Sequence, residues 1–252
     1  MKKIVVKIGT KLLTSPDRSL DIHNLKGIVD QISSLHSRFH VILVSSGSVT
    51  SGSKVMDIIP ETIPEKQAAA AVGQILLMQK YAHAFGKNQI QVGQILLSKE
   101  GIADPTRQKN ISNTIQKLLA HRVIPIVNEN DSVATDEIRF GDNDELSSHV
   151  ARLVQASCLL LLTDIDGLYK TLPTSSSKGQ IISTVTGVTN SLLSLAKGPQ
   201  NNWSRGGMKS KLLAAKYATE HGIKTVIANG RRKNVIVDCI EGKPVGTTLN
   251  PI

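Results

Sequence analysis

The stretch "NDELSSHVARLVQASCLLLLTDIDG", residues 143–167, decides the fold class. Its first part, 143–156, is typical of a helix, and 157–164 is an almost continuous apolar run of strand length. A strand that is apolar throughout is expected in a parallel sheet covered by helices on both faces. The stretch therefore predicts a helix that leads into a buried strand.

The rest of the chain repeats this alternation. We expect further strands at 2–8, 40–46, 91–98, 122–128 and 223–229, and further helices at 22–37, 65–86, 106–121 and 207–221. This order predicts an α/β protein with a mostly parallel sheet between helices. The segments 171–180 and 196–207 are expected to be loops, and 241–252 a turn and a short strand.

The composition is that of an ordinary globular protein. Of the 252 residues, 40% are hydrophobic and 20% charged, which suits one large α/β domain or two small ones. Lys7 and Lys11 interrupt the apolar N-terminus, and no window approaches the roughly 18 to 20 apolar residues of a membrane span. Cys158 and Cys239 lie in apolar segments without metal-ligand spacing. We expect a soluble cytoplasmic protein with no membrane partner and reduced cysteines.

The formal net charge of +10 raises nucleic acid as a partner. However, the basic residues are scattered, and their tightest clusters, 209–211 and 230–234, have no interleaved aromatic residues on which bases could stack. Anionic small molecules account equally well for local basic loops. We therefore expect no nucleic-acid partner.

Chemistry-bearing residues follow the expected strands. Ligands of open α/β sheets bind beyond the carboxyl ends of the strands. Glycines, hydroxyls, carboxylates and lysines crowd the segments 7–11, 45–53, 128–133, 163–167 and 229–234. The segment 204–211, "SRGGMKSK", opens a helix with paired glycines and nearby lysines, as a phosphate cradle would. Each segment alone is also compatible with an ordinary turn, and no Walker A sequence occurs.

A second stretch, "RFGDNDELSSHVA" at 139–151, gathers carboxylates in a basic chain. A metal site, a helix cap and a substrate clamp are all compatible with it. Asp142 and Glu145 have the D-x-x-E spacing of a cap for a helix that begins near Asn143. That spacing leaves Asn143 and Asp144 for another role.

Seven ordered segments, spread over nearly the whole chain, resemble the amino acid kinase family. They are "VVKIGTKLL" (5–13), "LVSSGSV" (43–49), "KQAAAAVGQ" (66–74), "IPIVNENDSV" (124–133), "FGDNDELSSHVA" (140–151), "LLLLTDIDGLY" (159–169) and "GGMKSKLLAA" (206–215). "NEND" and "GDND" indicate the branch of that family whose members phosphorylate glutamate. The resemblance implies an αβα sandwich around a mostly parallel, about eight-stranded sheet. It also implies a single amino acid kinase domain over 1–252, without the C-terminal PUA domain of many members.

The activity that this resemblance implies is phosphorylation of the γ-carboxylate of L-glutamate by ATP with Mg²⁺, in the first step of proline biosynthesis. Lys7, Asp144 and Lys211 match the catalytic positions. Lys7 would lie nearer the transferring phosphoryl group and Lys211 nearer the β–γ bridge, with Asp144 holding both lysines. No protein ligand of the metal is assigned.

The binding residues are implied in the same way. Ser46, Asp131 and Asn143 match the glutamate-binding positions. The nucleotide-binding positions correspond to Lys7, Thr163, Asp164, Arg205, Gly206, Gly207, Met208, Lys209, Ser210 and Lys211. The family loop commonly reads Gly-Thr-Gly-Gly-Met where this chain has "SRGGM" at 204–208, so the effect of Ser204 and Arg205 on nucleotide affinity stays open.

The resemblance also implies partners. They are L-glutamate, proline as a feedback inhibitor at an overlapping site, further copies of the chain in a homo-oligomer, and glutamate-5-semialdehyde dehydrogenase as the acceptor of a labile product. Two alternatives share the fold: another amino acid kinase that acts on a carboxylate or carbamate, and a regulatory amino-acid-binding module. Such a module would not need Lys7, Asp144 and Lys211, which disfavours it. Salt-sensitive RNA binding without kinase activity would instead favour a nucleic-acid-binding protein.

Overall fold

The structure is a computed structural model that describes residues 1–133, 142–171, 179–189, 192–193 and 207–251. The strands are β1 (Lys3–Ile8), β2 (His40–Val44), β3 (Val92–Leu97), β4 (Ile124–Glu129), β5 (Cys158–Thr163), β6 (Tyr169–Thr171), β7 (Gln180–Ile181), β8 (Thr184–Thr186), β9 (Lys224–Asn229) and β10 (Thr247–Asn250). The helices are α1 (Thr10–Leu13), α2 (Ile22–Leu35), α3 (Ser48–Val55), α4 (Ile63–Gly86), α5 (Lys99–Ala103), α6 (Pro105–Ala120), α7 (Asn143–Leu153), α9 (Met208–Glu220) and α10 (Val235–Ile240).

Eight strands form one sheet in the order β3-β4-β2-β1-β5-β9-β10-β8. Every neighbouring pair is parallel except β9 and β10, which are antiparallel. The chain leaves β1 for β2 on one side and later returns to β5 on the other. The carboxyl ends of β1, β2 and β5 therefore meet at a topological switch point, where α/β proteins bind their ligands.

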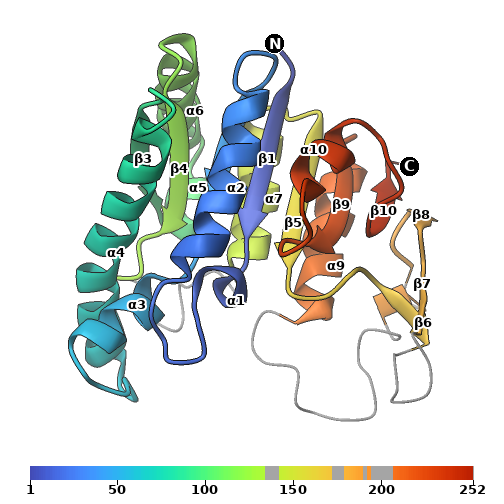
Figure 1. The fold of residues 1–252 in the computed structure, drawn as a ribbon. Helices are drawn as coiled ribbons and strands as arrows, with labels where there is room; N and C mark the ends of the chain where they lie inside the picture. Colours follow the sequence, from blue (N-terminus) through green and yellow to red (C-terminus); the bar gives the residue numbers. More distant parts are fainter. Residues whose placement is uncertain (134–141, 172–178, 190–191, 194–206, 252) are drawn as a thin grey trace.

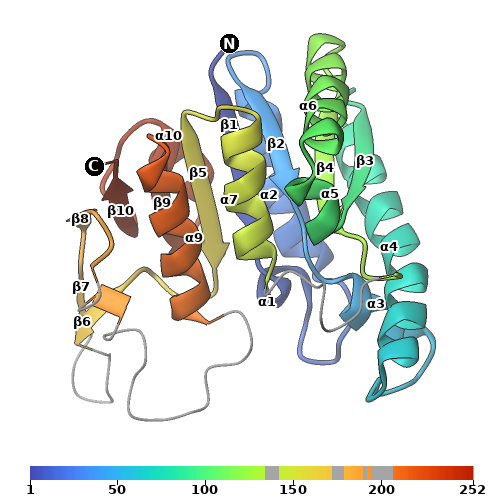
Figure 2. The ribbon, with the colours of Figure 1, turned by 180° about the vertical axis from the view of Figure 1, so that it is seen from behind.

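Helices cover both faces of the sheet, which confirms the expected three-layer architecture. Figure 1 shows α2, α4 and α10 in front of the strands, and Figure 2, seen from behind, shows α6, α7 and α9 over the opposite face. Alternate residues of β1 enter different cores, because Val6 belongs to the cluster under α2 and Val5 to the cluster under α7. Since both faces are covered, the central strands have no solvent-facing side, and this explains their continuous apolar sequence.

The six expected strands and five expected helices are all present within a few residues of their predicted ends. The cysteines are buried and free, as expected. Within the described ranges, no helix has the length and apolar character of a membrane span. The segments 172–178 and 196–206, which belong to the expected loops, lie outside the described residues.

The segment 45–53 differs from the turn that its glycines and hydroxyls allowed. From Ser48 onward it is helix α3, which lies against α4. A Cβ built at Gly73 would overlap the carbonyl oxygen of Ser48, and one at Gly52 would overlap the carbonyl oxygen of Ala69. The two backbones approach so closely that only glycine fits at these positions. The contact fixes α3, and with it the loop that follows β2.

Replacing Gly73 with Ala should therefore destabilise the protein. The added methyl group overpacks the α3–α4 contact, which costs about 1 to 3 kcal/mol, measurable by urea unfolding. Gly86→Ala, in the same helix, is the matched control, because a Cβ there meets no heavy atom within 4 Å. The control should be neutral or slightly stabilising, since alanine restricts the unfolded chain. Equal stability of the two variants would contradict the role of this contact.

Candidate active site

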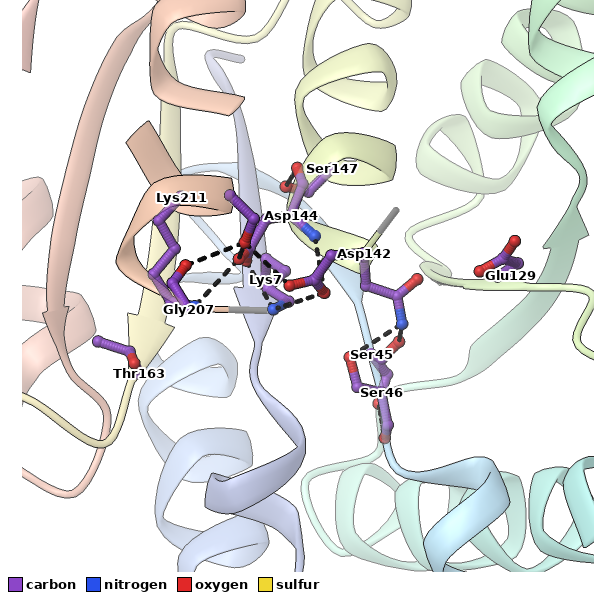
Figure 3. A network of polar contacts seen from close by, with 12 residues as sticks. Lys7, Ser45, Ser46, Glu129, Asp142, Asp144, Ser147, Thr163, Gly207 and Lys211 are labelled. Carbon is purple, nitrogen blue, oxygen red and sulfur yellow. Dashed lines mark hydrogen bonds and ion pairs between the residues drawn. The ribbon is translucent and has the colours of Figure 1, made fainter. Parts of the chain in front are cut away.

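Two lysine side chains share one buried carboxylate at the switch point. Lys7 Nζ on β1 lies 2.6 Å from Asp144 Oδ1, and Lys211 Nζ on α9 lies 3.0 Å from Asp144 Oδ2. Asp144 is 0% exposed, Lys7 2% and Lys211 5%. Figure 3 shows the three side chains gathered from a strand and two helices that are distant in sequence.

Asp142 and Ser210 extend this cluster. Asp142 Oδ1 lies 3.6 Å from Lys7 Nζ. The hydroxyl of Ser210 lies 2.9 Å from Asp144 Oδ2 and 3.0 Å from Asp142 Oδ2, so it can donate to either carboxylate. Two carboxylates thus face two ammonium groups, and the cluster is close to neutral until an anion approaches.

The start of α7 explains how the carboxylates reach this place. Asp142 is the N-cap, and its side chain accepts from the backbone N–H of Asp144 at 3.4 Å. The expected cap is therefore present, but a cap alone does not describe Asp142, because the same carboxylate also faces Lys7. The first turn of the helix projects Asn143 and Asp144 to two sides of the cap. Within the described residues, no group of three or more His, Cys, Asp or Glu side chains could form a metal site.

Burial and charge oppose each other in this cluster. Burial by itself would lower the pKa of Lys7, but the charges of Asp144 and Asp142 outweigh it and hold the pKa above its ordinary value of 10.5. Burial would likewise raise the pKa of Asp144, but Lys7 and Lys211 lower that pKa to about 2. Lys7 and Asp144 are therefore both ionised at neutral pH.

Asn143 joins the lysine cluster to a set of buried amides and hydroxyls. Its Nδ2 lies 2.9 Å from the Ser45 carbonyl oxygen, from Ser46 Oγ and from Asn128 Oδ1. These contacts place the end of β2, the end of β4 and the start of α7 around a single amide. Ser46 and Asn143, expected to bind the same ligand, are thus in direct contact.

Asp131 lies beyond this amide cluster, beside a cavity of about 230 Å³. Ser48 Oγ donates to its carboxylate at 3.1 Å. The cavity is also lined by Glu129 at the end of β4 and by Gln74 of α4. Figure 3 shows Glu129 on the side of the lysine cluster that is opposite Thr163.

Thr163 and Asp164 lie at the carboxyl end of β5. Thr163 is 5% exposed and donates to Asp164 at 3.2 Å, and Asp164 also forms an ion pair with Lys11 at 3.1 Å. Burial would raise the pKa of Asp164, but the hydrogen bond and charge of Lys11 keep it below its ordinary value. Thr163 lies on the Lys211 side of the cluster (Figure 3).

The N-terminus of α9 faces the same region. Gly207 is its N-cap, and no side chain among the described residues caps the helix there. Met208 is buried and Lys209 is exposed. A helix start without a side-chain cap presents its first backbone N–H groups and its dipole to an anion. Arg205 and Gly206, which the sequence also indicated as nucleotide contacts, lie outside the described residues.

Sequence reasoning missed Gln74 as a member of the site. It ends the alanine-rich segment 66–74, which belongs to the family resemblance, but no role was assigned to it. A signal existed nonetheless, because Gln74 falls at helical spacing among Ala70, Leu77 and Tyr81, which are all buried. A polar residue at a core position of an amphipathic helix needs a buried partner.

Comparison with known proteins gives a consistent result. Residues 2–229 match the model of the "Amino acid kinase family". The chain is 44% identical to the glutamate 5-kinase of Clostridium tetani, with 100% of this chain and 96% of the relative covered. It is 40% identical to that of Syntrophus aciditrophicus, with 100% of this chain and 66% of the relative covered.

A similar fold occurs in solved structures. The UMP kinase of Bacillus anthracis aligns with a TM-score of 0.67 and 15% identity, over 99% of this chain and 96% of that one. The UMP kinase of Ureaplasma parvum aligns with a TM-score of 0.64 and 18% identity, over 99% and 100%. At these identities the likeness concerns the fold alone.

Replacing Asp144 with Asn should strongly destabilise the protein. The change leaves two buried ammonium groups without their shared counter-charge, and breaking such a buried pair costs about 3 to 5 kcal/mol. Glu220→Gln is the control, because Glu220 forms an exposed ion pair with Lys216 at 3.8 Å, and such pairs contribute about 0 to 1 kcal/mol. Urea unfolding at neutral pH measures both. Similar small losses in the two variants would contradict the analysis.

The loss in Asp144→Asn should also depend on pH. In the natural protein the pKa of Asp144 is lowered, so the stability that this carboxylate contributes is lost only as the pH falls below 3.8. The pKa of Lys7 is raised, so the stability that this ammonium group contributes is lost only as the pH rises above 10.5. Without Asp144, burial should lower the folded-state pKa of Lys7 below its unfolded value. The unfolded state then binds more protons, so the variant gains stability as pH rises from about 7 to about 10. A constant difference in unfolding free energy over that range would contradict this.

Proposed function

Because the chain belongs to the amino acid kinase family, we propose that it transfers the γ-phosphoryl group of ATP to the γ-carboxylate of L-glutamate. The product is L-glutamyl 5-phosphate, formed in the first step of proline biosynthesis. The observation that carries the proposal is the buried Lys7–Asp144–Lys211 cluster, which adjoins amides and carboxylates suited to an amino acid.

The chemistry needs position and charge more than it needs a base. A γ-carboxylate oxygen attacks the γ-phosphorus, the bond to the β–γ bridging oxygen breaks, and ADP leaves. The attacking carboxylate is already ionised at neutral pH, so no proton has to be removed. What opposes the reaction is repulsion between two anions, and positive charge fixed beside the transferring group lowers that barrier.

Lys7 and Lys211 supply this charge. Lys7, on β1, lies nearer the transferring phosphoryl group. Lys211, on α9, lies nearer the β–γ bridge. Asp144 keeps both ammonium groups oriented before the substrates bind, so little reorganisation is needed during the reaction. Ser46, Asp131 and Asn143 hold the glutamate on the opposite side from Thr163.

The donor set near α9 fits a triphosphate. Two ammonium groups and the N–H groups at an uncapped helix start are the usual ligands of phosphate oxygens. Thr163, Asp164 and the segment from Arg205 to Lys211 complete the nucleotide site. Mg²⁺ bound with ATP would supply further positive charge on the phosphates. No residue of this chain is assigned as its ligand.

Three further proposals rest on the resemblance to glutamate 5-kinases. L-Proline inhibits the enzyme at a site that overlaps the glutamate site, so saturating proline should lower glutamate turnover. The chain assembles into a homo-oligomer, which light scattering of the purified protein would reveal. The labile acyl phosphate passes to glutamate-5-semialdehyde dehydrogenase, and addition of that enzyme should outcompete an added hydroxylamine trap.

Substrate identity is tested by coupling ADP release to a panel of acceptors. With ATP and Mg²⁺, L-glutamate should be phosphorylated in preference to N-acetylglutamate, aspartate, carbamate and UMP. The expected selectivity follows from the carboxylate and amides that surround the acceptor end of the site. Turnover of another acceptor without turnover of glutamate would replace the proposal with a different amino acid kinase. RNA binding without any turnover would remove the kinase proposal altogether.

Lys211→Ala should lower kcat by roughly a hundredfold or more, because it removes a charge that stabilises the transferring group. Steady-state kinetics with saturating glutamate and ATP measure the change. Lys216→Ala is the matched control, since Lys216 lies on the same helix and its side chain is 41% exposed. The control should keep kcat near that of the natural protein. A near-normal kcat in Lys211→Ala would refute the assigned role.

A further inference from the structure

Gln74 carries a buried hydrogen-bond donor that has no partner in the described part of the chain. The residue is 9% exposed and lines the 230 Å³ cavity beside Asp131. Its Nε2 is fully buried, and no described residue accepts a hydrogen bond from it. A buried donor without an acceptor is unfavourable, so its presence at a cavity indicates an acceptor that enters from outside.

The orientation of this amide is fixed by its neighbour Asn128. The backbone N–H of Glu129 donates to Asn128 Oδ1 at 2.9 Å, and a backbone N–H can only donate. Asn128 must therefore turn its Nδ2 toward Gln74, where it donates to Oε1 at 2.8 Å. Rotating the Gln74 amide would bring two donors together. Nε2 is thus held as the group available to a ligand.

The charged groups that line the cavity are carboxylates, which favour a cation rather than a hydrogen-bond acceptor. Glu129 and Asp131 place two carboxylates at its wall, and Ser48 donates to Asp131 at 3.1 Å. A ligand that matches this lining presents an acceptor to Gln74 and a cation to the carboxylates. An α-amino acid head group has both, as an α-carboxylate and an α-ammonium. The cavity volume of about 230 Å³ far exceeds that of a single water, which takes about 30 Å³.

We propose that Gln74 is a specificity-determining residue whose Nε2 donates a hydrogen bond to the α-carboxylate of the amino acid substrate. The inference rests on the proposed function and identifies the subsite that binds the α-carboxylate and α-ammonium groups of the substrate. The substrate then extends from this cavity past Asn143 toward Lys7, along contacts of Asn128 with Asn143 at 2.9 Å and of Lys7 with Asp142 at 3.6 Å. Asn128 acts as a positioning residue, because it touches Gln74 and sets its orientation.

The first test is Gln74→Met, which keeps the bulk of the side chain and removes the donor. The KM for L-glutamate should rise about tenfold to a hundredfold, as expected for a lost hydrogen bond to a charged group. The kcat and the KM for ATP should stay within about threefold, because binding away from the reacting atoms is lost uniformly. Gln79→Met, at an exposed position of the same helix, is the control and should change none of these three constants.

A second variant leaves Gln74 in place but reverses the orientation of its side-chain amide. Asn128→Asp retains the acceptor for the Glu129 N–H and for Asn143 but turns the donor toward Gln74 into an acceptor. Gln74 Nε2 then donates to the new carboxylate, and Oε1 replaces it at the cavity. The KM for glutamate should rise as in Gln74→Met, and a thermal unfolding curve checks that the variant is folded.

An analogue distinguishes direct contact from general damage. 4-Aminobutyrate keeps the ammonium and the reacting carboxylate of glutamate but lacks the α-carboxylate. Its inhibition constant against glutamate should be the same for Gln74→Met and the natural protein. An unchanged KM for glutamate in folded Gln74→Met, or an equal weakening of 4-aminobutyrate, overturns the inference while leaving the kinase proposal standing. Absence of glutamate turnover by the natural protein would overturn both.

Discussion

The structure depends on a single electrostatic constraint, the sharing of the buried carboxylate of Asp144 between Lys7 and Lys211. Burial disfavours the charged form of Lys7, and Asp144 is the strongest of the charges that oppose this effect. The three residues come from β1, α7 and α9, so the constraint also fixes how these elements meet. The proposed phosphate site therefore contains its own anion, Asp144, which holds the lysines in place and limits the buried positive charge of the unliganded protein.

The parallel sheet supplies the place for this cluster. Carboxyl ends of neighbouring parallel strands open at the same edge, and the reversal of direction at β1 leaves a crevice there. Polar side chains then continue from the lysines through Asn143 and Asn128 to the cavity beside Gln74. In the proposed function, phosphate chemistry and amino acid recognition occupy two ends of this row of polar side chains. The arrangement supports a reaction that needs two anions aligned against their repulsion.

Local sequence predicted much of the architecture, because the relevant signals act over short distances. The apolar run of β5 indicates that both faces of the strand are covered, and the helix predicted at 65–86 is α4, which begins with a capping box between Thr62 and Glu65. Helix α3 was not predicted, since its formation depends on a close contact with α4 that glycines permit from both sides. Asp142 was predicted as a cap and is one, yet its contact with Lys7 spans 135 positions and has no local signature.

The sequence by itself determined the alternation of strands and helices, the family, and the residue types at the strand ends, because periodicity and ordered motifs are properties of neighbouring residues. Tertiary structure alone decided which charges are buried together and which way each amide faces. Gln74 shows the reason most clearly. Its helix marks it only as a polar residue at a core position, whereas the availability of its Nε2 follows from Asn128 and a backbone N–H of β4. Hydrogen-bond polarity is set by partners that folding brings together, and a linear sequence does not contain their arrangement.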